Sequence, residues 1–91
     1  MELTHRCIIV TGRVQGVGFR RSALRQAQDQ GLAATARNLP DGAVEIHVEG
    51  PEQALEEFTS WARKGPPLAR IDTCEYTDGI LQGLSGTIIL R

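Results

Sequence analysis

The sequence predicts an α+β fold in which two helices lie on one face of an antiparallel β-sheet. Two observations predict this class: stretches with the apolar patterns of strands recur along the chain, and two stretches with helical spacing interrupt them. The chain has 91 residues, enough to bury one modest core, and no repeat, low-complexity tract or linker divides it. We therefore expect one domain over residues 1–91.

The first third of the chain predicts a strand, a turn and a helix. Residues 6–14 include the longest apolar run and predict the first strand. A glycine-rich turn follows over residues 12–18, and helical spacing of apolar residues extends from about residue 19 to residue 30. Gly31 predicts the end of this helix because glycine adopts the left-handed conformation there, and Leu32 is placed for the hydrophobic contact of such a cap.

A strand, a turn and another strand are expected next. Residues 33–38 predict a second strand only weakly, since alanine and threonine give this segment modest β propensity. Residues 39–42 read Leu-Pro-Asp-Gly, a strong turn signal because proline fixes φ and glycine accepts positive φ. Beyond the turn, apolar and polar residues alternate, which predicts a third strand with one wet face. Its apolar residues are Val44, Ile46 and Val48, and its polar residues are Glu45, His47 and Glu49.

The last part of the chain predicts a second helix and two further strands. Gly50-Pro51 opens the helix, with proline at the favourable first position, and apolar residues recur at helical spacing up to residue 64. Residues 70–77 predict a fourth strand, and residues 86–90 a short fifth. The order β-α-β-β-α-β plus one strand is the ferredoxin-like plan of an α+β sandwich.

The composition excludes several classes of function. The chain carries 10 basic and 11 acidic residues, a formal net charge of −1, which argues against binding nucleic acid through a basic face. The longest apolar run is far too short to span a bilayer, and the amino terminus lacks the architecture of a signal peptide. We therefore expect a cytoplasmic protein with no nucleic-acid or membrane partner.

The cysteines and histidines do not form a recognisable pattern in the sequence. Cys7 and Cys74 have neither metal-ligand spacing nor the density of a disulfide scaffold, and two reduced structural thiols are expected. A bridge between them stays open, since both residues fall on strands that can be neighbours. His5 and His47 are isolated in the sequence, and His47 lies on the polar side of its strand, where a solvated side chain is expected rather than a ligand.

The fold plan brings two polar segments to one edge of the sheet. In a split β-α-β unit the first two strands run parallel with the third between them, so their carboxyl ends emerge at the same edge. The first strand ends in the turn of residues 13–20, and the second ends at Asn38. We therefore expect these two segments to meet.

The turn has the features of a phosphate-binding loop. Gly16 and Gly18 permit dihedrals that aim successive N–H groups into one concavity, and the following helix adds its positive N-terminus. Arg20, in the first helical turn, presents paired donors that match phosphate oxygens. Taken alone, the pattern also fits a tight connection with Arg20 on the surface, and Asn38 also fits a residue that starts a turn. The Walker and dinucleotide-binding motifs are absent.

The same residues resemble a known family. Residues 12–20, Gly-Arg-Val-Gln-Gly-Val-Gly-Phe-Arg, reproduce without a gap the first signature of the acylphosphatase family. The resemblance covers about residues 6–91. Further family residues stand at the expected distances: Gly31-Leu32, Arg37-Asn38, Asp41-Gly42, Val44-Glu45 and Gly50.

The resemblance implies an enzyme that hydrolyses the carboxyl–phosphate bond of acyl phosphates without a metal, another cofactor or a phosphoenzyme. It implies that Arg20 binds the phosphate of the substrate and that Asn38 orients the attacking water. The backbone N–H groups implied to hold the phosphate belong to Gln15, Gly16, Val17, Gly18 and Phe19. The expected partner is thus a small-molecule acyl phosphate, and the expected state is a monomer.

Three other functions remain open at this point. Larger hydrogenase-maturation proteins have an amino-terminal domain that resembles acylphosphatase and handles carbamoyl phosphate, although the short chain argues against this function. A non-catalytic phosphate- or anion-binding regulatory module on the same fold is the alternative from a different class, because fold alone does not decide function. An RNA-binding sheet is disfavoured, since Tyr76 is the only tyrosine and no strand has paired aromatic residues for base stacking.

Overall fold

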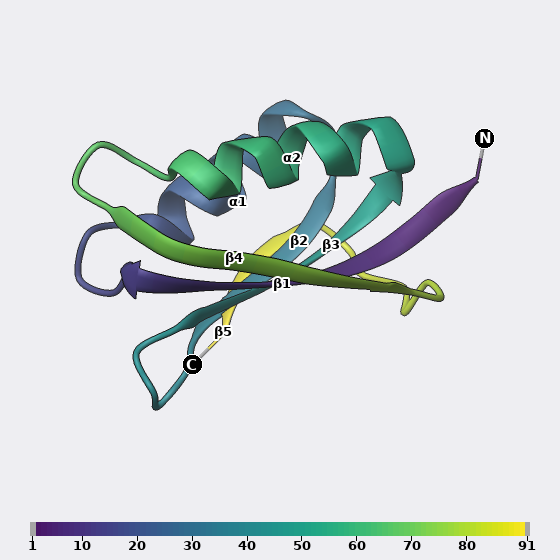
Figure 1. The fold of residues 1–91 in the computed structure, drawn as a ribbon. Helices are drawn as coiled ribbons and strands as arrows, with labels where there is room; N and C mark the ends of the chain where they lie inside the picture. Colours follow the sequence, from purple (N-terminus) through teal and green to yellow (C-terminus); the bar gives the residue numbers. More distant parts are fainter. Residues whose placement is uncertain (1, 91) are drawn as a thin grey trace.

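The computed structural model describes residues 2–90 and contains the expected sequence of elements. In chain order these are β1 (Leu3–Arg13), α1 (Phe19–Asp29), β2 (Ala33–Asn38), β3 (Val44–Pro51), α2 (Glu52–Lys64), β4 (Arg70–Gly79) and β5 (Thr87–Leu90). Both helices lie on the same side of the sheet (Figure 1). Neither is long and apolar enough to cross a membrane.

The sheet has the strand order β4-β1-β3-β2-β5. β3 lies between β1 and β2 and is antiparallel to both, as the split β-α-β plan requires, and β4 is antiparallel to β1. β5 adds to the outer edge of β2 in the parallel direction, which makes the five-stranded sheet mixed. The predicted ferredoxin-like α+β sandwich with an additional strand is therefore confirmed.

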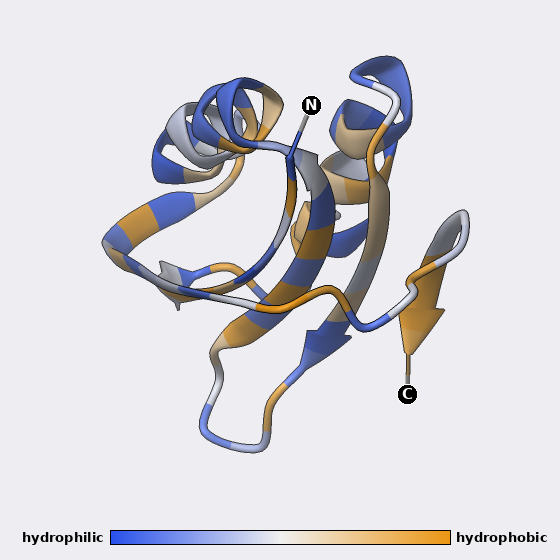
Figure 2. Cartoon of the chain, turned by 90° about the vertical axis from the view of Figure 1, so that its right-hand side faces the viewer, coloured by the Kyte–Doolittle hydropathy of each residue, from blue (hydrophilic) through white to orange (hydrophobic). Residues whose placement is uncertain are grey.

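The core lies between the helices and one face of the sheet. Alternate strand residues point into it, and Figure 2 shows the resulting alternation of hydrophilic and hydrophobic positions along the strands. The fully buried strand residues are Ile8, Val10, Ala34, Ala36, Val44, Ile46 and Val48, and the helices contribute Phe19, Ala23, Ala27, Leu55, Phe58 and Ala62. The opposite face of the sheet carries the other set of strand residues, which includes Cys7, Glu45 and His47.

The ends of the helices follow local signals with one difference. Gly31 has φ 72° after the end of α1, and the Leu32 N–H donates to the Ala27 carbonyl at 2.8 Å, so the predicted glycine cap is confirmed. Pro51 has an extended conformation and precedes the first helical residue of α2, whereas the sequence suggested that it was that residue. The difference is one position, as expected where a strand runs directly into a helix.

The two cysteines lie on opposite faces of the sheet. Cys74 is opposite Val10 in the β1–β4 ladder and packs against the core, while Cys7 is opposite His47 in the β1–β3 ladder on the other face. Both are free thiols, as expected. A bridge between Cys7 and Cys74 is therefore excluded, because strand alternation separates their side chains.

The two histidines are neighbours, and the expectation that they were isolated is wrong. His5 Nε2 lies 2.8 Å from His47 Nδ1, and His5 Nδ1 lies 2.8 Å from a carboxylate oxygen of Glu49. The antiparallel pairing of β1 and β3 brings these residues together although more than forty positions separate His5 from the other two. His47 is consequently half-buried rather than fully solvated.

Glu49 ties the segment between β4 and β5 to the middle of the sheet. Its carboxylate accepts hydrogen bonds from the backbone N–H groups of Gln82 and Leu84 as well as from His5. Burial alone would raise the pKa of the Glu49 carboxyl, but the hydrogen bonds from Gln82, His5 and Leu84 outweigh it and hold this pKa below its usual value. Glu49 therefore stays an ionised acceptor near neutral pH.

A buried arginine, which the sequence did not reveal, connects β1 to β4 and α2. Arg6 is 1% exposed, and its guanidinium donates to Asp78 at 2.7 and 2.9 Å, to Thr59 Oγ1 at 3.0 Å and to Glu56 at 3.1 Å. The ring of Tyr76 lies 3.8 Å from the guanidinium carbon. Hydrogen bonding to Arg6 lowers the pKa of the Asp78 carboxyl despite its partial burial.

Candidate functional site

The segment that leaves β1 is shaped by a bulge. The register between β1 and β4 shifts between Thr11 and Gly12, and Gly12 has φ 121°. A Cβ atom on Gly12 would lie 2.2 Å from the carbonyl oxygen of Arg70, so only glycine fits there. The bulge bends the end of β1 into the loop that precedes α1.

The loop between β1 and α1 presents backbone donors. Gly16 and Gly18 have φ values of 75° and 77°, a region that costs other L-residues about 1–2 kcal/mol. A Cβ on either glycine would meet no atom within 4 Å, so the backbone conformation and not space requires glycine. The N–H groups of residues 15–18 donate to no acceptor among residues 2–90. These N–H groups and those of the first turn of α1 are free to bind an anion.

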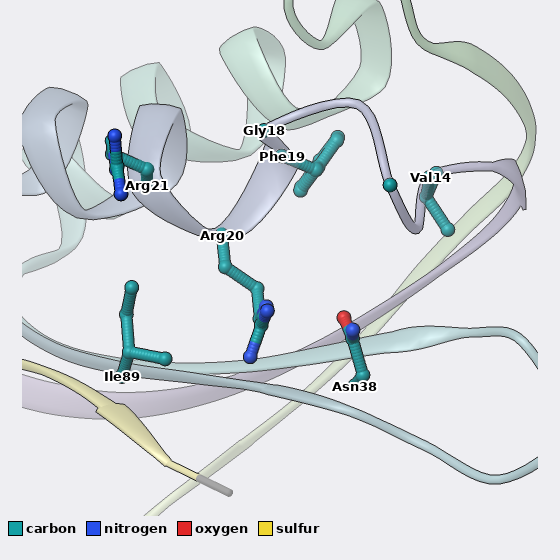
Figure 3. A pocket seen from close by; sticks show the side chains of 8 residues that line it. Val14, Gly18, Phe19, Arg20, Arg21, Asn38 and Ile89 are labelled. Carbon is teal, nitrogen blue, oxygen red and sulfur yellow. The ribbon is translucent and has the colours of Figure 1, made fainter.

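A hollow of about 330 Å³ lies between this loop, the first turn of α1 and the ends of β2 and β5. Arg20 enters it from α1 and Asn38 from the end of β2, and Figure 3 shows both side chains directed into the same space. The sequence placed these two segments at one edge of the sheet, and the structure brings them together there. The lining residues are Val14, Gly16, Gly18, Phe19, Arg20, Arg21, Asn38 and Ile89.

Asn38 carries a buried acceptor without a partner in the protein. Within residues 2–90 its Oδ1 atom is buried and receives no hydrogen bond. An unsatisfied buried acceptor costs about 1–3 kcal/mol, and such groups in folded proteins call for an explanation. Because the side chain faces the hollow, its Oδ1 is available to a donor that enters there, such as a water molecule.

Two of the expected loop residues point elsewhere. The carboxamide of Gln15 donates to the carbonyl oxygens of Leu39 and Ala43, each at 2.9 Å, and so fastens the loop to the turn between β2 and β3. Val17 packs against the core. Neither residue lines the hollow, so a contribution to ligand binding would come from their backbone N–H groups alone, and this stays a prediction.

Three residues of the hollow were missed by sequence reasoning. Val14 and Arg21 flank the predicted segment, and Arg21 also lines a neighbouring hollow along α1. Ile89 reaches the hollow because β5 pairs with β2 in parallel, with Ala36 opposite Ile89. No local sequence pattern indicates that β5 pairs with β2 in the parallel direction.

The charges around the hollow favour an anion. Arg20 and Arg21 line it, and its lining within the described chain includes no aspartate, glutamate or histidine. Free N–H groups and guanidinium groups stabilise negative charge without an opposing carboxylate. The fold and the hollow together define a small α+β protein with an anion-compatible loop before a helix N-terminus.

Comparisons with known proteins identify the family. The family model for acylphosphatase matches residues 6–84. An acylphosphatase of Thermus thermophilus is 49% identical over 78 residues, 86% of this chain and 89% of that protein. An acylphosphatase of Methylococcus capsulatus is 50% identical over 76 residues, 84% of this chain and 83% of that protein. The chain belongs to the acylphosphatase family, and its enzymatic activity is that of an acylphosphatase.

Solved structures agree with this assignment. The crystal structure of acylphosphatase from Bacillus subtilis matches with a TM-score of 0.92 and 40% identity, covering 99% of this chain and all of that one. The crystal structure of full-length HypF in the phosphate- and nucleotide-bound form matches with a TM-score of 0.91 and 28% identity. The match covers 99% of this chain but 12% of HypF, so the same fold also occurs within a much larger protein.

Proposed function

We propose that the hollow is the active site, in which water directly hydrolyses the carboxyl–phosphate anhydride of a small-molecule acyl phosphate. One observation carries the proposal: the Arg20 guanidinium, the free loop N–H groups and the unpartnered Oδ1 of Asn38 face one hollow. The products are a carboxylate and inorganic phosphate.

Arg20 and the loop hold the phosphoryl group. A guanidinium presents paired N–H donors that match two phosphate oxygens, and the N–H groups of Gln15, Gly16, Val17, Gly18 and Phe19 supply further donors on the other side. The glycine conformations fix these donors before the substrate arrives, so little reorganisation accompanies binding. Charge on the transferred phosphoryl oxygens is thus stabilised by preformed groups.

Asn38 positions the nucleophile. Its Oδ1 accepts a hydrogen bond from a water molecule, which leaves an oxygen lone pair of that water directed at phosphorus. The bound phosphate lies against Arg20, so the water is held between a fixed acceptor and a fixed electrophile. The unsatisfied acceptor in the free protein supports this role, because the water supplies the missing donor.

The chemistry needs few other groups. The leaving carboxylate belongs to an acid with a pKa of about 4, so it departs without a general acid. The transition state of phosphoryl transfer is largely metaphosphate-like, so positioning and charge stabilisation supply most of the rate. The attacking water loses its proton to a phosphate oxygen as the P–O bond to the carboxylate breaks. We propose a metal-free reaction because no carboxylate or imidazole lines the described part of the hollow.

The test is hydrolysis of benzoyl phosphate by the purified chain in the presence of a chelator. Arg20→Ala should nearly abolish kcat/KM, because it removes the side-chain donors to the phosphate. Arg25→Ala is the matched control: Arg25 lies on the same helix but does not line the hollow, and its removal should leave kcat/KM within about twofold. Phosphate binding without turnover by the wild-type chain would instead support the non-catalytic anion-binding module.

We further propose that residues 1–91 act as a monomeric, cytoplasmic single domain with no nucleic-acid or membrane partner. The free thiols and the net charge of −1 support this. Light scattering on the purified chain and fractionation of cells test the two statements. A stable dimer would contradict the first, and recovery in the membrane fraction the second.

A further inference from the structure

The face of the sheet opposite the helices holds a cluster of three different metal-ligand types. Cys7 and His47 are directly opposite each other on β1 and β3, and Glu45 is opposite Ile9, two positions along on the same face. The Sγ atom of Cys7 lies 3.8 Å from Nε2 of His47, and Oε1 of Glu45 lies 3.3 Å from that same nitrogen. All three potential donor atoms lie within 4.8 Å of one another, and all three residues are half-buried.

A chain of hydrogen bonds directs the lone pair of His47 into this cluster. The carboxylate of Glu49 accepts only, so His5 Nδ1 carries a hydrogen and donates to it. In the tautomer pair assigned from these contacts, His5 accepts at Nε2, and His47 Nδ1 carries the hydrogen and donates. The remaining nitrogen of His47, Nε2, has a free lone pair beside the oxygen of Glu45 and the sulfur of Cys7. Three potential donor atoms therefore converge on one point, and a metal cation bound there would displace the thiol hydrogen of Cys7.

The spacing of these atoms matches one metal geometry. In tetrahedral coordination with zinc–nitrogen and zinc–oxygen bonds of about 2.0 Å and a zinc–sulfur bond of about 2.3 Å, neighbouring nitrogen and oxygen ligands lie about 3.3 Å apart, and nitrogen and sulfur about 3.5 Å. The corresponding distances here are 3.3 and 3.8 Å. The nitrogen–oxygen distance already matches, the nitrogen–sulfur distance is a few tenths of an ångström longer, and the sulfur and oxygen atoms lie within 4.8 Å of each other.

We propose that Cys7, Glu45 and His47 form a binding site for Zn²⁺, with water in the fourth position. The mixed sulfur, nitrogen and oxygen donor set suits zinc, which accepts all three and prefers four ligands. The hydrogen-bond relay from Glu49 through His5 to His47 is the outer-shell arrangement that orients metal-binding histidines. None of the three ligands lines the hollow, so this site is separate from the proposed active site.

Arg37 is a neighbouring cation that bears on the site. Its guanidinium donates to Oε1 of Glu45 at 2.7 Å from the adjacent strand β2, and it holds the carboxylate on this face. The Arg37 side chain is 44% exposed, so its guanidinium is free to turn towards solvent when the metal binds. Replacing Arg37 is therefore unsuitable as a test. The change removes a cation that competes with the metal for the Glu45 carboxylate, but it also removes the contact that holds this carboxylate in place.

The experiment titrates the full-length, metal-free chain with ZnCl₂ in a non-chelating reductant, followed by calorimetry and thermal unfolding. One Zn²⁺ should bind per chain, and at a free zinc concentration of about 100 times the dissociation constant Tm should rise by roughly 10–20 °C. Cys7→Ser and His47→Gln should each weaken binding at least tenfold. Cys74→Ser is the matched control, because Cys74 lies on the other face, and it should bind zinc like the wild type.

Two further measurements test the zinc site independently of the Cys7 and His47 variants. Glu49→Gln, which leaves the three ligands in place but changes the relay, should weaken zinc binding by about 10–100-fold. Co²⁺ added in place of Zn²⁺ should give the absorption of a tetrahedral thiolate complex in the wild type and in Cys74→Ser, which decides the matter even if Cys7→Ser does not fold. Absence of stoichiometric zinc binding, or unchanged affinity in Cys7→Ser, would overturn the site whatever the outcome for benzoyl phosphate hydrolysis.

Discussion

Replacing Asn38 by alanine tests whether its carboxamide acts in catalysis rather than in folding. The Oδ1 atom receives no hydrogen bond from the described residues, so its removal breaks no such contact within them. The side chain is only half-buried at the edge of an open hollow, so little packing is lost with it. We expect the free energy of unfolding to change by no more than about 0.5 kcal/mol, which leaves Tm within about 4 °C of the wild-type value.

The same change should damage catalysis. Without an acceptor for the attacking water, turnover should fall by roughly 10²-fold or more, equivalent to about 2.7 kcal/mol of transition-state stabilisation. KM should stay close to the wild-type value, because the phosphate is held by Arg20 and the loop rather than by Asn38. The assay is steady-state hydrolysis of benzoyl phosphate, with thermal unfolding followed on the same protein sample.

The matched control is Thr35→Ala. Thr35 lies on the same strand as Asn38 but on the opposite face of the sheet and outside the hollow, so kcat and KM should remain unchanged. Wild-type turnover in Asn38→Ala would refute the role in positioning water. A fall in Tm of more than about 4 °C would show that Asn38 also supports the fold, and the loss of activity would then reflect a damaged fold.

The remaining predictions concern the buried arginine and the loop. Asp78→Ala should lower the free energy of unfolding in urea by about 2–3 kcal/mol, because it leaves the buried guanidinium of Arg6 underpaired. Arg6→Met should cost less, because it leaves unpaired only the Asp78 carboxylate, which is 38% exposed. A larger loss for Arg6→Met than for Asp78→Ala would contradict this explanation. The pKa of Asp78 is lowered in the folded chain, so its contribution is complete above its unfolded pKa of about 3.9 and is lost as pH falls through the lower folded value. The stability difference between wild type and Asp78→Ala should therefore shrink below about pH 4. Gly18→Ala should cost about 1–2 kcal/mol and raise KM, since alanine is strained at φ 77°; Gly79→Ala, at a position with open space and no positive φ, is the control and should change neither.

Local patterns in the sequence predicted most of the fold. The alternation of Val44, Ile46 and Val48 with polar residues needs no tertiary information, and it placed β3 with the correct face towards the core. Gly31 marked the end of α1 for an equally local reason, because its φ of 72° suits glycine. Such signals depend only on the backbone and on neighbours a few residues away.

The features that the sequence did not reveal depend on pairing between distant strands. Arg6 looks like an ordinary surface arginine until β4 and α2 supply Asp78 and Glu56. His5 and His47 looked isolated because their contact depends on the register of β1 and β3. A one-residue shift in that register would send one of the two side chains to the other face.

The candidate site shows the same division. Arg20 and Asn38 could be expected to meet because the split β-α-β plan fixes where the first two strands end. Ile89 was not expected in the hollow, because the sequence of the four residues of β5 does not indicate the strand with which β5 pairs or in which direction. The free Oδ1 of Asn38 also required the structure, because satisfaction of a hydrogen bond is a property of three-dimensional surroundings.

The hydrogen bonds that Glu49 accepts also affect the position of the last strand. Its carboxylate accepts from the backbone N–H groups of Gln82 and Leu84, and β5 begins only three residues after Leu84. Ile89 on that strand forms a side of the hollow. The segment that carries Ile89 is therefore held in place by a residue on the opposite face of the sheet. A substitution of Glu49 should change the shape of the hollow although Glu49 does not line it.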